Sequence, residues 1–409
     1  MSTAKNQPLI GVVNAEDRTL TVISGSPHAQ EAYVVVRSND KTVGYQRLAG
    51  YQSREELIEE ASAASVDQPR RRPWTAGQGE GHFATVIICT TGTNQLLLRA
   101  VAAVLEQQHQ DFELIVVDNA PQTGNVRKAL SSVDDPRLRI VDEPQAGLSR
   151  ARNTGVAHAR ADVVAFTDDD ALAHPGWLGA LIDVFAADPG RAIGAVTGPV
   201  FPAELVTEAQ RYFEARGGFP KTLSPTVWAL DNLLDQVSIF GDPGEGGPLY
   251  PMTTARIGAG VSMAFRRQAL SEMGSFDIRL GAGTKARGAE DLDAFARILR
   301  LGYAIVTTPD AVMYHTHRAD LAGLKAQAYG DGAGMAALLT KSVMQNPATV
   351  LTLARRIPAV LRRVAPGSQR MRGSQPGVPP ELARQEVCGF LSGPGLFLCT
   401  AARQSCGRR

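Results

Sequence analysis

The chain has 409 residues, 44% of them apolar, which is enough to bury a full core and to form more than one domain. Its net charge of +1 and the absence of a signal-type or membrane-length apolar run argue against a nucleic-acid-binding, secreted or membrane-spanning protein. Four scattered cysteines, none in a Cys-x-x-Cys pair, predict a cytoplasmic location without disulfides or a zinc site: Cys89, Cys388, Cys399 and Cys406.

Residues 1–64 are predicted to form a small β-rich module. Three short β-type runs precede a helical stretch rich in Glu and Ala, Arg54–Ala64. The runs are Leu9–Val13, Thr19–Ile23 and Ala32–Val36. Residues 65–82 are rich in Pro, Gly and Arg, and this composition indicates a linker.

Strand and helix patterns alternate from Ala84 onward. The predicted strands are Ala84–Thr91, Glu113–Asn119, Arg137–Val141, Asp162–Thr167 and Ala192–Val200. The predicted helices between them are Gln95–Gln108, Gly147–Ala159 and Pro175–Ala187. This alternation is typical of an α/β fold with a mostly parallel sheet and helices on both faces. Such a sheet binds its ligands in the crevice at the carboxyl ends of its strands.

Polar residues stand at three of these strand ends, namely Thr90-Thr91, Asp118-Asn119 and Asp168–Asp170. Because strand residues alternate between faces, Asp168 and Asp170 point the same way. Neighbouring carboxylates are stable as anions beside a cation, and Mg²⁺ or Mn²⁺, which also bridge phosphate oxygens, are the natural partners. Asp168–Asp170 alone could equally be a solvated turn that caps the next helix. Three polar strand ends together favour a binding site.

The alternation of strand and helix patterns is weak after Val200 and returns at Gly258. Residues 201–257 are rich in Pro and Gly and are predicted to be an insertion. A strand follows at Gly258–Phe265, and Glu290–Leu301 is an amphipathic helix. Ala304–Thr307 and Ala311–Tyr314 are predicted to be extended.

Residues 321–409 are predicted to be a helical, basic extension. From Lys341 onward, eleven Lys and Arg residues stand against two acids, a net charge of +9, which leaves −8 for the rest of the chain. As a helix, Leu351–Val364 has an apolar face and an arginine-rich face, a pattern of helices that lie on anionic lipid. Packing against the catalytic domain explains the pattern equally well, and Pro358 weakens a continuous helix.

Five segments in a fixed order resemble one enzyme family: ATVIICTT, ELIVVDNAP, GLSRARNTGVAHARADVVAFTDDDA, GAGVSMAFRR and GAGTKARGAEDLDAFARILRLGY. Together they resemble a family 2 inverting glycosyltransferase with the GT-A nucleotide-sugar fold. The resemblance covers about residues 83–320. It implies that this region is the catalytic domain, that the donor is a nucleotide-diphosphosugar, and that a divalent metal ion, Mn²⁺ or Mg²⁺, takes part.

The resemblance also implies roles for the strand-end acids. The last Asp of the family's Asp-x-Asp binds the metal and the first contacts the nucleoside or the metal's water shell, which implies these roles for Asp170 and Asp168. Asp118 matches the position that binds the base. Many family members have two acids there, whereas this chain has Asp118-Asn119, so the identity of the base is left open.

Further nucleotide-binding residues follow from the same comparison. The family's Ala-Arg-Asn faces the nucleotide, which implies that Arg152 and Asn153 do so here. The planar guanidinium of an arginine suits phosphate or base recognition. Thr90 and Thr91, at the end of the first strand, are assigned to the same nucleotide site.

The helix that starts at Glu290 is predicted to carry the catalytic base. Capping of the helix N-terminus by Glu290 and Asp291 is the simplest explanation of these acids. Inverting sugar transfer, however, needs one base for the acceptor hydroxyl, and the family's Glu-Asp supplies it. The resemblance therefore implies that Asp291 is the base and Glu290 supports it.

Two histidines are candidates for a third metal ligand. His315 and His317 share one face of an extended segment, and either could bind a metal. The family often has a metal-binding histidine here, and we predict His315. The glycine-rich Gly281–Gly288 is predicted to be either a mobile lid on the acceptor side or a plain surface loop.

The resulting prediction is a metal-dependent inverting glycosyltransferase with a hydroxyl acceptor, lipid-linked or a cell-envelope polysaccharide, bound peripherally to the inner face of the plasma membrane. One alternative is a sugar-phosphate nucleotidyltransferase. Such enzymes have a basic glycine-rich loop directly after the first strand, whereas here the first basic residue after the strand that ends at Thr91 is Arg99. The other is a non-catalytic sugar-nucleotide-binding scaffold, which the presence of Asp170 and Asp291 disfavours.

Overall fold

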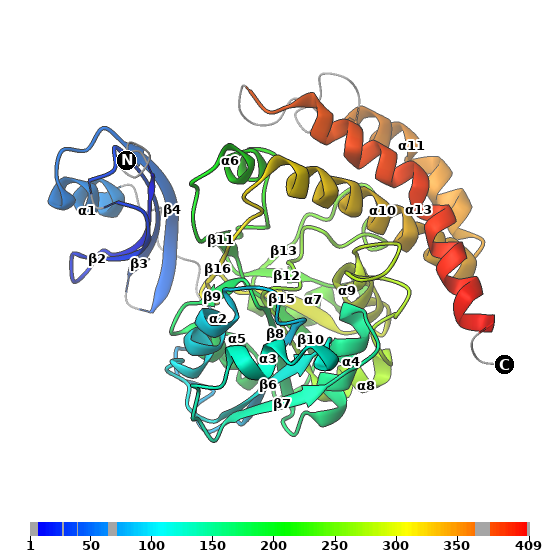
Figure 1. The fold of residues 1–409 in the computed structure, drawn as a ribbon, viewed down its shortest axis with the longest axis horizontal. Helices are drawn as coiled ribbons and strands as arrows, with labels where there is room; N and C mark the ends of the chain where they lie inside the picture. Colours follow the sequence, from blue (N-terminus) through cyan, green and yellow to red (C-terminus); the bar gives the residue numbers. More distant parts are fainter. Residues whose placement is uncertain (1–6, 27, 39, 64–71, 365–376, 407–409) are drawn as a thin grey trace.

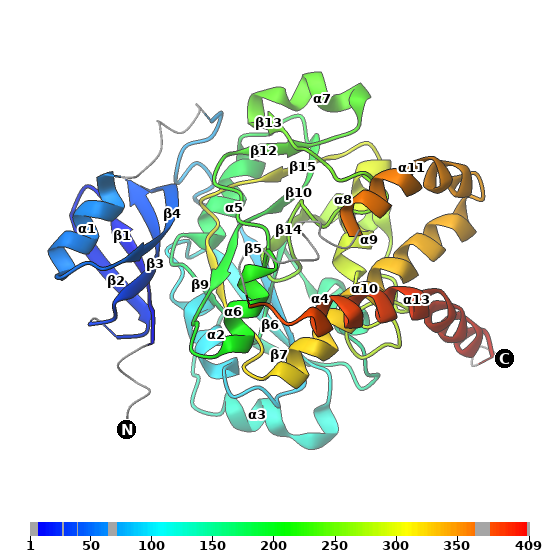
Figure 2. The same cartoon turned by 90° about the horizontal axis from the view of Figure 1, so that it is seen from above.

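The computed structural model describes residues 7–26, 28–38, 40–63, 72–364 and 377–406, with the backbone alone for residues 357, 359–364 and 403–406. The start of the predicted linker, 64–71, lies outside this part of the chain. An α/β domain occupies the centre of the molecule. The N-terminal module and the C-terminal helices lie on opposite sides of it (Figures 1 and 2). The predicted fold class is confirmed.

The N-terminal module is a four-stranded sheet in the order β2-β1-β3-β4, with one helix packed on it. Its elements are β1 (Leu9–Asn14), β2 (Thr19–Ser24), β3 (Glu31–Ser38), β4 (Lys41–Ala49) and α1 (Arg54–Ala63). The strand β4 was not predicted. On the face away from α1, apolar residues of β1 and β3 pack against Phe201 and Tyr314 of the central domain, so the module is docked rather than tethered.

The central domain is built on a nine-stranded sheet in the order β13-β12-β15-β10-β14-β8-β5-β6-β7. Most neighbouring strands run parallel, and the antiparallel pairs are β12-β15, β10-β14 and β14-β8. In chain order the strands are β5 (Ala84–Thr90), β6 (Phe112–Asp118), β7 (Leu138–Asp142), β8 (Val163–Asp168), β10 (Ile193–Thr197), β12 (Thr226–Trp228), β13 (Asp242–Pro243), β14 (Met263–Arg266) and β15 (Ala304–Thr307).

Helices cover both faces of this sheet, because β5, β6 and β8 are apolar on both sides and must be buried on both. Two large apolar clusters form the resulting core. The helices, with one 3-10 turn, are α2 (Leu97–Leu105), η2 (Pro121–Thr123), α3 (Asn125–Ala129), α4 (Leu148–His158), α5 (Trp177–Ala186), α8 (Arg267–Met273) and α9 (Glu290–Arg300).

The segment predicted to be an insertion, 201–257, is instead partly integral to the domain. Its strand β12 joins the central sheet beside β15. The strand β11, near the start of this segment, belongs to a separate three-stranded sheet in the order β11-β16-β9. The remaining elements of these parts are β9 (Ala171–Ala173), β11 (Val200–Pro202), α6 (Glu208–Ala215), α7 (Asp231–Val237), η3 (Ser238–Phe240) and β16 (Met313–His315). Short elements such as these give too little periodicity to be seen in the sequence.

The described part of the predicted linker, 72–82, packs on the domain. Trp74 is buried and stacks on Phe240 with ring centroids 6.2 Å apart. The backbone amides of Gly77 and Gly79 donate to the carboxylate of Asp183 at 3.1 and 2.7 Å. These contacts hold residues 72–82 against the central domain, so this part of the chain is packed and does not act as a free linker.

The C-terminal extension consists of α10 (Leu321–Gln345), α11 (Thr349–Val364) and α13 (Pro380–Cys406). The backbones of α10 and α13 lie so close that a Cβ on Gly332 or Gly389 would overlap the opposite helix. The helix α11 continues through Pro358, which we expected to weaken it. Among the described helices, none combines the length and the apolar character needed to cross a membrane.

Candidate functional site

The carboxyl ends of β5, β6 and β8 meet as the sequence predicted. The strand register pairs Thr90 with Asp118 and Cys89 with Asp168. Next to this edge, β16 runs antiparallel to β9, and the register places His315 opposite Ala171. This pairing brings His315 to the Asp-x-Asp sequence although nearly 150 residues separate them.

Asp168, Asp170 and His315 form the cluster in which a metal could bind. One ligand atom from each lies within 4.8 Å of the others. In this geometry His315 Nε2 is 3.1 Å from Asp170 Oδ1. Two carboxylates and one imidazole suit Mn²⁺ or Mg²⁺, so the donor set fits the predicted ion. The structure assembles His315, and not His317, with the two acids.

The charges of this cluster are coupled. Burial, and the nearby Asp170, raise the pKa of Asp168 to about 7, although Arg152 opposes the shift. Burial would also raise the pKa of Asp170, but His315 beside it lowers that pKa below its usual value. Burial would lower the pKa of His315, and Asp170 raises it. Without a cation, protons therefore balance the negative charge, and a bound cation must displace them.

Asp169 points away from the cluster and fixes the end of β5. Its carboxylate accepts hydrogen bonds from Thr90 Oγ1 and, at 3.1 Å, from Asn94 Nδ2. Thr90 is thus a positioning residue at the edge, while the Thr91 hydroxyl lies 3.0 Å from that of Thr93 in the following loop. The structure gives Thr90 a partner that the sequence did not reveal.

Asp118 and Asn119 at the end of β6 have different surroundings. Asp118 is fully buried; its Oδ1 accepts from the Ala120 amide at 3.0 Å, and its Oδ2 makes no hydrogen bond but lies 3.6 Å from Arg127 Nη1. Asn119 donates to the carbonyls of Glu143 and Gln145 and accepts from the Gly147 amide. The amide at position 119 therefore shapes the loop before α4, which a second acid could not do in the same way.

Arg152 lies between the two groups of acids rather than on an open nucleotide surface. It is buried, and its Nη1 is 2.6 Å from Glu290 Oε1, while its Nη2 is 3.8 Å from Asp168 Oδ1. A Cβ on Gly260 would come within 2.6 Å of Nη2, so a glycine is needed there. Burial raises the pKa of Glu290, and the ion pair with Arg152 opposes this shift.

Asn153 makes a different contact from the predicted one. Its Nδ2 donates to the Phe276 carbonyl at 3.0 Å, and its Oδ1 accepts from the Phe276 amide at 2.7 Å. Asn153 therefore holds the segment that leads into Gly281–Gly288. That loop is itself closed by a hydrogen bond from the Gly281 amide to the Gly288 carbonyl, and the Leu148 amide donates to Ala282.

Asp291 opens α9 beside a cleft of about 460 Å³. Its Oδ2 accepts from the Gly260 amide at 2.8 Å, and its Oδ1 from the Leu292 amide at 2.8 Å. Each oxygen keeps a free lone pair, so the carboxylate can still accept a proton. The cleft runs between the 246–259 segment, α10 and α13, and apolar residues line much of it, among them Phe219, Trp228, Tyr250, Leu324, Met335 and Phe390.

We predict that Arg152→Met destabilises the fold, because it leaves the buried Glu290 without its partner. Loss of one member of a buried ion pair costs roughly 3–5 kcal/mol of unfolding free energy. The double variant Arg152→Met/Glu290→Leu should recover most of that loss. The control is Arg160→Gln, whose side chain is largely exposed. Urea unfolding measures all four proteins; equal stability of Arg152→Met and wild type would contradict the prediction.

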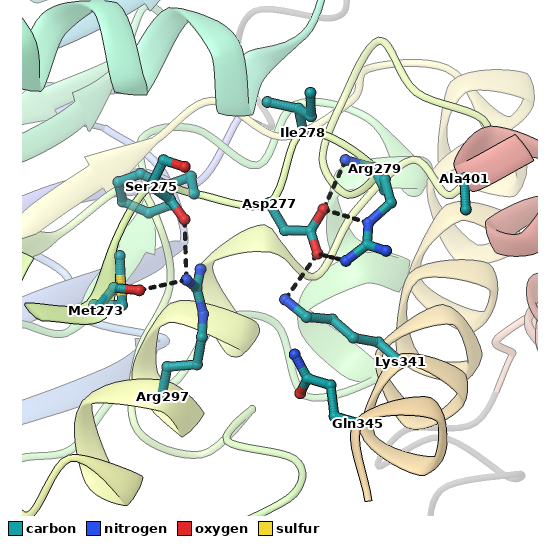
Figure 3. Close-up of a pocket in the computed structure, with 10 residues that line it drawn as sticks. Met273, Ser275, Asp277, Ile278, Arg279, Arg297, Lys341, Gln345 and Ala401 are labelled. Carbon is teal, nitrogen blue, oxygen red and sulfur yellow. Dashed lines mark hydrogen bonds and ion pairs between the residues drawn. The ribbon is translucent and has the colours of Figure 1, made fainter. Parts of the chain in front are cut away.

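A larger cleft, of about 610 Å³, has none of the predicted site residues in its wall. It is lined by an ion-pair network (Figure 3). Lys341 of α10 bridges Asp277 at 2.8 Å and Asp293 of α9 at 2.7 Å, and Arg279 also binds Asp277. This network attaches the C-terminal helices to the helix that carries Asp291. The charged residues Asp277, Arg279 and Lys341 of this cleft pair with one another, which favours a structural role.

Comparison with known proteins adds three findings. Residues 85–274, just under half of the chain, match the model of the family described as Glycosyl transferase family 2. A glucosyl-dolichyl phosphate glucuronosyltransferase of Haloferax volcanii is 27% identical over 237 residues, which cover 56% of this chain and 68% of that protein. An inactive polypeptide N-acetylgalactosaminyltransferase-like protein 5 of Macaca fascicularis is 25% identical over 57% of this chain and 51% of that protein.

Solved structures give a weaker likeness. A mannosyltransferase from Pyrobaculum calidifontis, in complex with GDP-Man and Mn²⁺, aligns with a TM-score of 0.44 and 19% identity, over 81% of this chain and 90% of that one. The family match ends at residue 274 and thus precedes Asp291 and His315. The match therefore does not bear on the predicted roles of these two residues.

Proposed function

The chain belongs to glycosyl transferase family 2 through its residues 85–274, and we propose that it moves a sugar from a nucleotide-diphosphate donor to an acceptor hydroxyl with inversion at the anomeric carbon. One observation carries the proposal. Arg152 connects the two groups of acids, since its Nη2 lies 3.8 Å from Asp168 of the possible metal cluster and its Nη1 lies 2.6 Å from Glu290, the neighbour of Asp291. Donor and acceptor groups can therefore approach a sugar from two sides.

The strand ends supply the donor site in this proposal. The buried Oδ2 of Asp118 lies 3.6 Å from Arg127 Nη1 but makes no hydrogen bond, so it can accept one from the base. Asp168, Asp170 and His315 would hold the metal ion, which would neutralise the charge that develops on the leaving diphosphate. Arg152 keeps Asp168 and Glu290 in place and adds a positive charge beside the diphosphate.

Asp291 performs the proton transfer. Its carboxylate accepts the proton of the acceptor hydroxyl while that oxygen forms a bond to the anomeric carbon. The bond between this carbon and the diphosphate oxygen breaks on the opposite side, and the diphosphate leaves with the electron pair. The Gly260 amide fixes the orientation of the Asp291 carboxylate, so that little rearrangement is needed for the reaction.

The acceptor in this proposal is amphiphilic and lipid-linked. Apolar residues line much of the cleft next to Asp291, and Phe390 of α13 forms part of its wall. Beyond it, α13 exposes Val387, Leu391 and Leu398, at spacings that place them on one side of the helix. The Haloferax relative, named for a dolichyl phosphate substrate, is consistent with this class.

We predict salt-sensitive binding to anionic vesicles through the C-terminal helices. Arg355 and Arg356 are exposed on α11, and each basic residue near such a surface contributes roughly 1 kcal/mol. Arg355→Gln/Arg356→Gln should therefore weaken vesicle binding by roughly 30-fold in a co-sedimentation assay, the equivalent of two such contacts. The control, Arg99→Gln/Arg160→Gln, removes the same charge elsewhere. An equal loss in both would show that no specific surface is involved.

Point variants are needed here because truncation would disturb the fold. A chain that ends before Lys341 would leave Asp277 and Asp293 without their shared partner. It would also remove α13, which packs on α10. A loss of vesicle binding after truncation would then be ambiguous.

A thermal-shift screen tests the proposed donor class. Ligands that bind the folded state raise the melting temperature by mass action. One plate of nucleotide-diphosphosugars, and of sugar phosphates combined with nucleoside triphosphates, each with Mn²⁺ and with chelator, should yield a shift for one family of nucleotide sugars, and a larger one with Mn²⁺. Shifts with sugar phosphates plus nucleoside triphosphates alone would favour a nucleotidyltransferase.

A further inference from the structure

A second histidine and a glutamate lie directly behind the candidate metal ligand. His315 Nδ1 is 3.1 Å from His317 Nδ1, and His317 Nε2 is 2.9 Å from Glu214 Oε1. The other oxygen of Glu214 is 2.8 Å from Lys221 Nζ. These side chains therefore form a continuous row of polar contacts from α6 to the edge of the central sheet. The helix α6 lies in the segment that was predicted to be an insertion.

The donor and acceptor properties of these groups determine which atom donates in each hydrogen bond of this row. Glu214, paired with Lys221, is a carboxylate and can only accept, so His317 Nε2 must carry the hydrogen. In a neutral imidazole the other nitrogen, Nδ1, is then an acceptor. It faces His315 Nδ1, which must donate. The remaining nitrogen of His315, Nε2, is the atom that points to Asp170.

We propose that Glu214 and His317 form a relay that holds His315 in the tautomer with hydrogen on Nδ1, and so presents the Nε2 lone pair to the divalent cation. Both residues are positioning residues, since neither reaches the Asp168–Asp170 cluster itself. A histidine that binds a metal commonly donates its other N–H to a polar partner, and this contact sets its orientation and basicity. The inference rests on the metal role proposed above for His315.

The packing around the two imidazoles supports this function. His317 is almost fully buried, and Phe213 packs against it in a tilted arrangement with centroids 4.5 Å apart. Phe219 packs edge-on against His315 at 5.0 Å. These rings fix the imidazole planes and exclude water that could replace the relay's hydrogen bonds.

The test measures Mn²⁺ affinity by electron paramagnetic resonance of the free ion, with the full chain and without nucleotide. His317→Phe keeps an aromatic ring between Phe213 and Phe219 but removes both hydrogen bonds. We expect its dissociation constant for Mn²⁺ to rise by roughly 10–100-fold. Glu214→Leu should act similarly. Glu214→Gln should lose less, because the amide oxygen can still accept from His317 Nε2.

Two comparisons make the result decisive. The matched control Glu208→Gln lies on the exposed side of α6 and should bind Mn²⁺ like wild type. Melting temperatures confirm that each variant is folded. Wild-type affinity in His317→Phe would overturn the relay, and so would equal losses in Glu214→Gln and Glu214→Leu. If the wild-type chain itself binds no Mn²⁺, the proposed metal role fails, and the relay falls with it.

Discussion

Asp291→Asn should reduce the transfer rate by roughly 10²–10⁴, the usual contribution of a positioned general base, with donor affinity near that of wild type. The amide has nearly the same size as the carboxylate, and its oxygen can still accept from the Gly260 amide. It cannot accept the acceptor's proton. The Leu292 amide at the start of α9 then loses its acceptor, which should lower stability modestly while the fold persists.

The measurement for Asp291 is a paired one. Calorimetry gives donor affinity, and nucleotide release in the presence of acceptor gives the rate. Asp231→Asn is a matched control, since Asp231 also opens a helix, α7, and is exposed. A variant that binds donor poorly would make Asp291 a binding residue. A variant that transfers at the normal rate would remove it from the mechanism.

Asp170→Ala should abolish metal-dependent donor binding. Asp170 is one of three side chains in the cluster, and its loss leaves Asp168 and His315 alone. We expect the Mn²⁺ dissociation constant to rise by more than roughly 100-fold, the upper end of the effect of residues behind a metal ligand. Chelation of the wild type should likewise stop turnover.

Mn²⁺ titrations followed by electron paramagnetic resonance compare Asp170→Ala with wild type and with Asp134→Asn. Asp134 is an exposed acid far from the cluster in sequence and should have no influence. Full donor turnover in excess chelator would contradict the metal role. Unchanged Mn²⁺ affinity in Asp170→Ala would exclude this cluster as the metal site.

The part of the site that lies on consecutive parallel strands could be predicted from the sequence. The apolar runs that end in Asp118 and Asp168 specify neighbouring strands, and parallel strands end at one edge. The amphipathic pattern after Glu290 likewise defined α9 and placed its acids at the helix start. Local patterns contain this information because strand and helix periodicity act over a few residues.

The contacts between distant segments could not be predicted in the same way. The pairing of β16 with β9, which selects His315, involves three residues on each strand. Arg152 was expected on the nucleotide surface, but its partner Glu290 lies 138 residues away and draws it into the interior. Glu214 stands in a segment without clear periodicity. Nonlocal pairs of this kind depend on the tertiary fold, and residue spacing alone does not encode them.

The anomeric configuration of the product tests the central claim most directly. Once the donor screen has identified the nucleotide sugar, the wild-type enzyme is incubated with it and an amphiphilic acceptor, and NMR reads the new glycosidic linkage. A single base on the side opposite the leaving diphosphate predicts inversion, so an α-configured donor should give a β-linked product. A retained configuration would contradict the proposed attack assisted by Asp291.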